Sequence, residues 1–390
     1  MYKIMFSAGE VSGDLHGARL AEAIRKKQPD AVLFGFGGAQ MAAAGVRLAA
    51  DMADYSVMGF WEVFKNLQRL FRLREKLTAV MAAERPDLLV LIDYPDFNWR
   101  LAKRAKKLGI PVLSYIPPSA WAWRQGRARD CAGLADEFLA IFPFETKVYE
   151  AAGANISFIG NPLVDTVRPA LTPEAARRYF AIETGQRPVL LLPGSRRQEI
   201  SLLLPVMLQA AAKIQTEYPA AVFFLPVAQG LDRQPMEAMA ADAGVAVRFT
   251  TEHTYDLMGC CELAIATSGT VVLEAALMGL PCIVLYRLSP VSYCIGRLLV
   301  HVKYFSLPNI LAGREIQPEL LQSEVNPERI LKEARRFLSD TVYASTVREQ
   351  LERACRRLGE PDAAGRAADH ILAAAARSRQ QQGNLSGESL

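Results

Sequence analysis

The chain has 390 residues, of which 51% are hydrophobic and 22% charged, and these values are typical of a globular protein with two sizeable cores. The formal net charge of +4 is too small to indicate a nucleic-acid partner. The sequence contains no run of about 18 apolar residues, so it predicts no membrane span. The opening residues, MYKIMFSAGE, indicate a first strand rather than a signal peptide.

Metal-binding residue types are sparse and scattered. The four histidines lie far apart, and the six cysteines lack the Cys-x-x-Cys or Cys/His spacings of metal sites. We therefore expect no metal site and no cofactor, and reduced thiols of the kind found in cytosolic proteins.

Short apolar segments alternate with helical patterns in the first half of the chain. The segment Lys3–Ser7 leads into the small-residue turn AGEVSGDLHG and a helix over Ala18–Lys27. Further strands are predicted at Ala31–Phe36, Leu88–Ile92, Val112–Tyr115, Phe138–Ile141 and Ser157–Ile159. Near-continuous apolar strands between helices predict a parallel sheet that is covered on both faces.

The same pattern restarts after a Pro-containing linker, Asn161–Pro173. Its strands are predicted at Val189–Leu192, Val222–Leu225, Val245–Phe249, Leu263–Ala266 and Cys282–Leu285. The sequence thus predicts two doubly wound α/β domains, residues 1–165 and 166–344, which face each other across a cleft. We expect the helices of 345–376 to pack back on the first domain and the Ser/Gln/Gly-rich tail, 377–390, to be disordered.

Polar residues follow several strands at their carboxyl ends, where such sheets bind ligands. Glu10 follows the first strand, and Asp93 follows Leu88–Ile92. In the second half, two turns supply the polar groups Gly194, Ser195 and Arg196 (PGSR) and Ser268, Gly269 and Thr270 (TSGT). Each set also has an ordinary explanation, such as a helix cap or a surface ion pair between Arg196 and Glu199.

The two turns of the second half suit a nucleotide diphosphate. The helix after TSGT begins with unpaired N–H groups beside hydroxyls, which favour a phosphate. Arg196 offers a planar cationic fork, and Glu274 can accept hydrogen bonds from ribose or serve as an ordinary helix-surface glutamate. The turns lack the Walker spacing, and the first turn lacks GxGxxG. We predict a nucleotide site here and an acceptor with a base in the first half.

Eight stretches, in order from about residue 3 to residue 323, resemble the lipid-A-disaccharide synthase family. They are SAGEVSGDLHG, VMGFWEV, IDYPDFN, PPSAWAWRQGR, FPFE, LLPGSRRQEI, TSGTVVLEAALMGLPCIVLYR and SLPNILAGREIQPELLQ. The resemblance implies a GT-B type fold and an inverting glycosyltransferase without a metal. Such an enzyme transfers 2,3-diacylglucosamine from its UDP carrier to the 6-hydroxyl of 2,3-diacylglucosamine 1-phosphate and releases UDP.

The resemblance also assigns roles to single residues. Asp93 matches the general base, with Glu10 as its rival, and Arg196 would neutralise the UDP diphosphate. Two matches, Asn309 and Gln322, would belong to the donor site. Asn161 stands where the family often has histidine, which leaves the role of that position open.

A basic amphipathic segment, Val57–Leu77, fits a membrane surface because the substrates carry acyl chains. The residues expected to contact lipid are Met58, Phe60, Trp61, Phe64, Lys65, Arg69, Phe71 and Arg72. The alternative is a core helix with a solvated basic face. We expect a peripheral protein on the cytoplasmic face of the inner membrane, with the oligomeric state open and a homodimer included.

Two functions of other classes remain open at this point. A nucleotide-sugar epimerase would share the two-domain architecture and bind UDP, but it would need no lipid-facing segment. A non-catalytic lipid-binding module would leave the carboxylates at the strand ends without a purpose. Release of UDP by a lipid acceptor separates the transferase from the epimerase.

Overall fold

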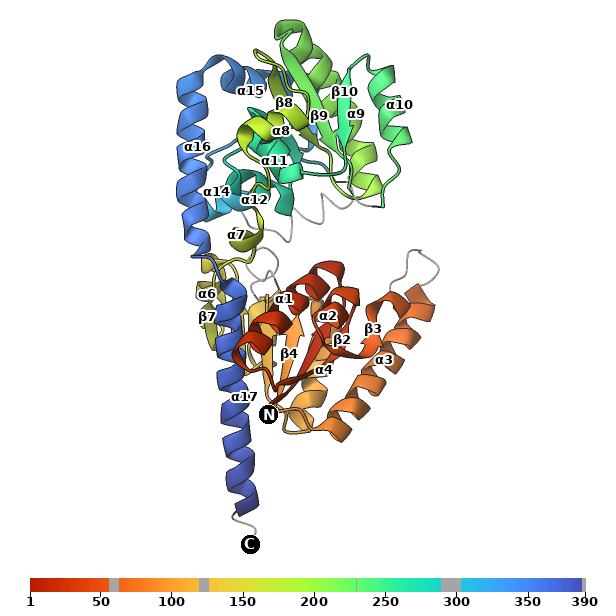
Figure 1. Cartoon of the computed structure of the whole chain (residues 1–390), viewed down its shortest axis with the longest axis vertical. Coiled ribbons are helices and arrows are strands. Elements are labelled where there is room, and N and C mark those ends of the chain that lie inside the picture. Colours follow the sequence, from red (N-terminus) through yellow and green to blue (C-terminus); the bar gives the residue numbers. More distant parts are fainter. Residues whose placement is uncertain (56–62, 119–125, 229, 289–302, 388–390) are drawn as a thin grey trace. The chain divides into compact units, whose positions relative to one another are not determined.

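The computed structural model describes residues 1–55, 63–118, 126–228, 230–288 and 303–387. The chain divides into two compact units, each shown in Figure 1. Unit 1 comprises Met1–Pro162 and Leu358–Leu390, and unit 2 comprises Leu163–Arg357. The predicted linker, Asn161–Pro173, therefore contains the boundary between them. Each unit carries one parallel sheet, and the expected pair of doubly wound α/β folds is confirmed.

Unit 1 is built on seven parallel strands in the order β3-β2-β1-β4-β5-β6-β7. They are β1 (Lys3–Ala8), β2 (Val32–Gly37), β3 (Arg47–Asp51), β4 (Leu88–Ile92), β5 (Val112–Tyr115), β6 (Glu137–Ala140) and β7 (Ile156–Phe158). Its helices are α1 (Val11–Lys27), α2 (Ala39–Ala43), α3 (Val63–Glu84), α4 (Pro95–Lys107), α5 (Gly126–Ala132), α6 (Pro143–Glu150) and α17 (Ala363–Gly387). Strand β3 was not predicted.

Two apolar layers enclose this sheet. Leu20 and Ile24 of α1 and Ile371 of α17 are buried against Ile4 and Val90 on one face. Figure 1 shows α17 running alongside α1 within unit 1. The other face is covered by α3, α4, α5 and α6, whose apolar side chains bury Met5, Leu89 and Val112. The apolar strands predicted from sequence are thus buried on both sides.

Unit 2 has six parallel strands in the order β10-β9-β8-β11-β12-β13. They are β8 (Arg187–Leu192), β9 (Ala221–Pro226), β10 (Val247–Thr250), β11 (Leu263–Thr267), β12 (Cys282–Tyr286) and β13 (Glu319–Leu321). Its helices are α7 (Leu163–Thr166), α8 (Pro173–Tyr179), α9 (Arg197–Glu217), α10 (Gln234–Asp242), α11 (Thr254–Cys260), α12 (Thr270–Leu277), α14 (Leu307–Ala312), α15 (Pro327–Ser339) and α16 (Thr341–Cys355). Strand β13 was not predicted.

Of the two terminal helices, one packs on the first domain as expected for 345–376 and the other does not. The helix α16 packs on α12, α14 and α15 in unit 2, whereas α17 packs on α1 and β4 in unit 1. The two helices are separated at Gly359 and Asp362, which have φ values of +89° and +74°. The breaker sequence Gly-Glu-Pro-Asp at 359–362 was the signal for this division.

The tail also differs from the expected disorder, because α17 continues through Gly387. Arg377 donates a hydrogen bond to Glu137 Oε2 (3.2 Å), and Arg379 donates one to the Met1 carbonyl (2.7 Å). Lengthening an existing helix needs no new nucleus, and Arg, Gln and Ser are tolerated in helices. The polar composition of the tail therefore did not exclude a helix.

The first helix begins seven residues earlier than predicted, at Val11, so SGDLHG lies on α1. A Cβ on Gly13 would meet Ala8 Cβ at 3.4 Å, and one on Gly17 would meet Met41 Sδ at 2.6 Å. Gly17 therefore allows α1 to lie close to Met41, whereas a side chain at Gly13 would make an ordinary van der Waals contact. The early start places Glu10 and the first turn of α1 at the carboxyl end of β1.

Candidate active site

Seven of the predicted donor-site residues line one pocket of about 460 Å³ in unit 2, here called the unit 2 pocket. It lies at the carboxyl ends of β8, β9 and β11. The predicted residues that it brings together are Gly194, Ser195, Arg196, Ser268, Gly269, Thr270 and Glu274. Two turns that are about 70 residues apart in sequence thus form one site, because parallel strands end at the same edge of a sheet.

The PGSR turn presents the cation of the pocket. The Arg196 side chain is 82% exposed, and its Nη1 lies 3.3 Å from Oε1 of Glu199. The other carboxylate oxygen of Glu199 accepts hydrogen bonds from the N–H groups of Ser195 (3.2 Å) and Arg196 (3.4 Å). The ion pair between Arg196 and Glu199 that the sequence allowed is therefore present, and it lies inside the pocket.

The TSGT turn presents the amino end of α12. The Ser268 N–H donates to the Leu285 carbonyl (2.9 Å), and its hydroxyl donates to the Phe305 carbonyl (3.1 Å). Ser268 therefore fixes the turn, whereas Gly269 and Thr270 are exposed. First-turn N–H groups have no acceptor within their own helix and favour an anion.

Two further groups border this site. Burial raises the pKa of Glu274, which lines the pocket. Burial also raises the pKa of Tyr286; the charge of Glu199 acts in the same direction and that of Arg196 opposes it. Tyr286 was not predicted, although it ends β12 and the carboxyl ends of strands were the signal to follow.

Asn309 does not line the unit 2 pocket. It is fully buried, and its Nδ2 donates to the Gln317 carbonyl (2.9 Å) and to Oε1 of Glu319 (2.8 Å). Its Oδ1 accepts from the N–H groups of Ile316 (2.9 Å) and Gln317 (3.2 Å). The amide therefore holds a loop together, and the structure does not support the direct donor contact expected from sequence.

Gln322 and Asn161 likewise make internal contacts. Gln322 Oε1 accepts from the Leu288 N–H (2.8 Å), and its Nε2 donates to the Leu288 carbonyl (3.2 Å). Asn161 is buried, and its Nδ2 donates to the Ile141 carbonyl (3.3 Å). Gln322 thus clamps the chain after β12, and Asn161 supports the end of β6.

In unit 1, Asp93 occupies a strained turn at the carboxyl end of β4. Asp93 and Tyr94 both have φ of +49°, which is uncommon for residues other than glycine and clusters at functional sites. Asn98 Nδ2 donates to the Asp93 carbonyl (2.7 Å), which pins the turn. Burial raises the pKa of Asp93, as suits a general base, while a hydrogen bond from the Tyr94 backbone opposes this shift.

Glu10 and Tyr94 lie beside this turn. The ring of Tyr94 covers Gly9, where a Cβ would be only 2.2 Å from Tyr94 Cδ1. Burial raises the pKa of Tyr94, and the charges of Glu10 and Asp96 add to the effect. Both predicted carboxylates, Asp93 and Glu10, are therefore brought to one edge of the unit 1 sheet.

The comparisons with known proteins identify the family. The model of the family described as lipid-A-disaccharide synthetase matches residues 4–371. A lipid-A-disaccharide synthase of Geobacter sulfurreducens is 41% identical over 371 residues, which are 95% of this chain and 97% of that protein. The chain belongs to the lipid-A-disaccharide synthase family. It is therefore an enzyme of the glycosyltransferase class, with lipid-A-disaccharide synthase activity.

Solved structures show the same fold at low identity. A putative UDP-N-acetylglucosamine 2-epimerase from Listeria monocytogenes superposes with a TM-score of 0.64 at 17% identity, covering 97% of both chains. A UDP co-structure of MnaA from S. aureus superposes with a TM-score of 0.65 at 14% identity, covering 95% of this chain and 96% of that one. These likenesses support the GT-B fold of the synthase family. Family membership, rather than fold, separates a synthase from an epimerase.

His16 lies close to the sheet of unit 1 and was not among the residues predicted from the sequence. It lies on α1, and its ring packs edge-on to that of Tyr115 with centroids 6.3 Å apart. Burial, with the charge of Arg19 as a second cause, lowers its pKa to about 4. Its buried Nδ1 has no hydrogen-bond partner among the described residues. The neutral imidazole thus lies on α1 beside Tyr115, the last residue of β5.

The expected lipid-contact segment lies partly outside the described residues. Met58, Phe60 and Trp61 fall there, and Phe64 and Lys65 belong to the start of α3. Farther along the helix, Phe71 is 57% exposed, and Arg69 and Arg72 are exposed. Leu73, Leu77 and Met81 of the same helix are fully buried. The described part of α3 is therefore a core helix with a basic outer face.

None of the described helices has both the length and the apolar character needed to cross a lipid bilayer.

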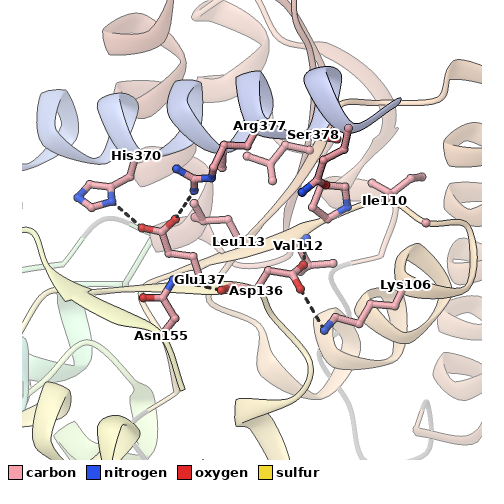
Figure 2. Close-up of a pocket in the computed structure, with 15 residues that line it drawn as sticks. Lys106, Ile110, Val112, Leu113, Asp136, Glu137, Asn155, His370, Arg377 and Ser378 are labelled. Carbon is pink, nitrogen blue, oxygen red and sulfur yellow. Dashed lines mark hydrogen bonds and ion pairs between the residues drawn. The ribbon is translucent and has the colours of Figure 1, made fainter. Parts of the chain in front are cut away.

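A second cavity, of about 840 Å³, lies in unit 1 under α17 (Figure 2). It lies at the amino ends of β4, β5 and β6, whereas Asp93 lies at the carboxyl end of β4. Its charges pair with one another: Glu137 binds His370 Nδ1 (2.6 Å) and Arg377 (3.2 Å), and Lys106 binds Asp136 (3.3 Å). The two contacts of Glu137 anchor α17 to β6, whereas the contact of Lys106 joins α4 to the residue before β6. Although this cavity is larger than the unit 2 pocket, the predicted site residues lie elsewhere, so we do not assign the chemistry to it.

Proposed function

We propose that this synthase transfers 2,3-diacylglucosamine from UDP-2,3-diacylglucosamine to 2,3-diacylglucosamine 1-phosphate with inversion, and releases UDP. The observation that carries the donor assignment is the unit 2 pocket. It combines the Arg196 guanidinium, the amino end of α12 and the half-buried Glu274. Cationic and N–H groups of this kind stabilise a leaving diphosphate.

We assign Asp93 as the general base of this proposed reaction. A single displacement with inversion needs one base, which takes the proton of the attacking hydroxyl as that oxygen bonds to the anomeric carbon. The raised pKa and the fixed turn of Asp93 support this role. Glu10, which is exposed directly before α1, remains the rival base.

In the donor site, Arg196 neutralises the diphosphate, Glu274 accepts from ribose hydroxyls, and Gly269 and Thr270 donate backbone N–H groups. Asn309 and Gln322 act through the loops that they hold. The Phe305 carbonyl accepts from Ser268, while Glu319, a partner of Asn309, accepts from the N–H groups of Phe305 and Ser306 (both 2.9 Å). This chain of contacts would keep the TSGT turn in place.

The direct test is an assay of purified protein with both lipid substrates in detergent, followed by detection of UDP and a disaccharide phosphate. Arg196→Met should reduce kcat/KM for the donor by about 100-fold, because a charge-assisted contact to phosphate is lost. Arg353→Met is the matched control, since Arg353 is exposed on α16 outside the unit 2 pocket. Absence of product with the wild-type protein would refute the transferase assignment, and an unchanged kcat/KM for Arg196→Met would refute the role of Arg196.

We further propose that the outer face of α3 binds an anionic membrane at the cytoplasmic face of the inner membrane. Phe71 is exposed, the Arg74 guanidinium lies 4.4 Å from its ring centroid, and Arg69 and Arg72 of the same helix are exposed. Apolar and cationic groups together favour such a surface. Phe71→Ser with Arg69→Gln and Arg72→Gln should reduce sedimentation with phosphatidylglycerol vesicles, while neutral vesicles serve as the control. Light scattering would test whether the chain forms a homodimer, since the oligomeric state is open.

A further inference from the structure

The Glu199 carboxylate binds the PGSR turn, which is one of the two turns expected to bind a nucleotide diphosphate. It lines the unit 2 pocket from the first turn of α9. Its Oε2 accepts from the N–H groups of Ser195 and Arg196, and its Oε1 lies 3.3 Å from Arg196 Nη1. In this structure, an internal anion therefore holds the N–H groups and the cation of the turn.

Gly194 shows that the turn is shaped around this carboxylate. Its φ is +116°, and a Cβ at this position would lie 2.3 Å from Glu199 Oε2 and 2.9 Å from Glu199 Cβ. Glycine is required both by the backbone conformation and by the approach of the glutamate. The contact is thus built into the turn.

The contacts of Glu199 with the turn are nevertheless weak enough for a diphosphate to replace them. The hydrogen bonds to Oε2 measure 3.2 and 3.4 Å, and the Arg196 guanidinium is 82% exposed. Long bonds and exposed ion pairs contribute little stability. A diphosphate carries more negative charge than a carboxylate and can therefore compete with Glu199 for Arg196. The negative charge of Glu199 stays nearby, however, and repels the diphosphate.

We propose that Glu199 limits the affinity of the donor site for UDP: it holds Arg196 and the turn in the empty site, and it yields Arg196 to the diphosphate. The inference rests on the proposed donor site. Because the repulsion acts on every diphosphate in the pocket, it favours departure of the UDP product. Glu199 is then a residue that tunes affinity through Arg196, and not a general base.

The test is calorimetric titration of UDP into wild type and Glu199→Gln, which keeps the side-chain oxygen but loses the charge. We expect UDP to bind the variant about three- to tenfold more tightly, with UDP product inhibition strengthened by the same factor. Uridine, which lacks the phosphates, should bind both proteins equally. Glu237→Gln is the matched control, because Glu237 pairs with Arg233 outside the unit 2 pocket and should leave UDP binding unchanged.

The sign of the change decides the proposal. Equal or weaker UDP binding by Glu199→Gln would show that the carboxylate only supports the turn, and an equal gain for uridine would also overturn the inference. Glu199→Ala, which frees the same N–H groups, should show the same tightening and serves as a second variant if the first does not fold. If wild type binds no UDP, the proposed donor site itself fails.

Discussion

Ser7 and Asn98 are 91 residues apart, yet the Ser7 hydroxyl donates a hydrogen bond of 2.6 Å to Oδ1 of Asn98. Both side chains are buried, and Asn98 Nδ2 donates to the carbonyls of Ser7 (3.1 Å) and Asp93 (2.7 Å). The pair therefore joins β1 to the turn that carries the proposed base. Two consecutive residues at positive φ are costly, and such contacts stabilise them.

This relationship predicts that Asn98→Ala lowers both stability and activity. The substitution leaves the buried Ser7 hydroxyl without its acceptor, which should cost about 1–3 kcal/mol of unfolding free energy. It also releases the Asp93 turn, so kcat should fall more than the donor KM changes. Urea unfolding and steady-state kinetics measure the two effects. Asn155→Ala is the control, since the hydrogen bond of the Asn155 side chain to the Asp136 carbonyl (3.3 Å) is exposed.

Asp93→Asn should reduce kcat by about 100-fold or more, because it removes the proposed base. Burial raises the pKa of Asp93 above 3.8, and the base acts only when ionised. The wild-type kcat/KM should therefore fall as the pH is lowered through this raised pKa. Since the fold disfavours the ionised form, the Asn variant should be as stable as wild type or more so at neutral pH.

A comparison with Glu10→Gln separates the two carboxylates. If Glu10→Gln loses the acid limb of the pH profile and Asp93→Asn keeps it, Glu10 is the base instead. If both variants keep full activity, neither carboxylate accepts the proton.

Asn309→Ala should behave as a structural variant. Four hydrogen bonds are lost at a fully buried position, so we expect the free energy of unfolding to fall by about 2–4 kcal/mol. UDP affinity should weaken in parallel, because the loop reaches Ser268 through Phe305. Differential scanning calorimetry and UDP titration check this. A variant of normal stability without activity would instead indicate the direct substrate contact suggested by the sequence.

Glu137→Gln should loosen α17 without affecting catalysis. The carboxylate is buried and binds His370 and Arg377, so its loss should cost about 1–3 kcal/mol of stability. Figure 2 shows these partners reaching Glu137 from α17. Hydrogen exchange of α17 should increase, while kcat at low temperature should stay within about twofold of wild type. Glu349→Gln on the exposed face of α16 is the control.

The sequence by itself determined the two parallel sheets and the turns at their carboxyl ends. Buried strands such as β4 and β11 are short apolar runs, and this pattern is local. Parallel strands end at a common edge, so the sequence also predicted that Arg196, Ser268 and Thr270 would meet, as they do in the unit 2 pocket.

Only the tertiary structure decided what each polar side chain does. Asn309 is a loop anchor because Gln317 and Glu319 fold back onto it, and Asn98 holds the Asp93 turn because β1 lies beside β4. Likewise, α1 begins at Val11, and Gly17 on this helix lies against Met41 of α2, which is 24 residues away in the sequence. A strand pattern repeats locally and can be read from the sequence. A hydrogen bond or close approach between distant segments depends on their distance and direction in the folded chain, which no local pattern contains.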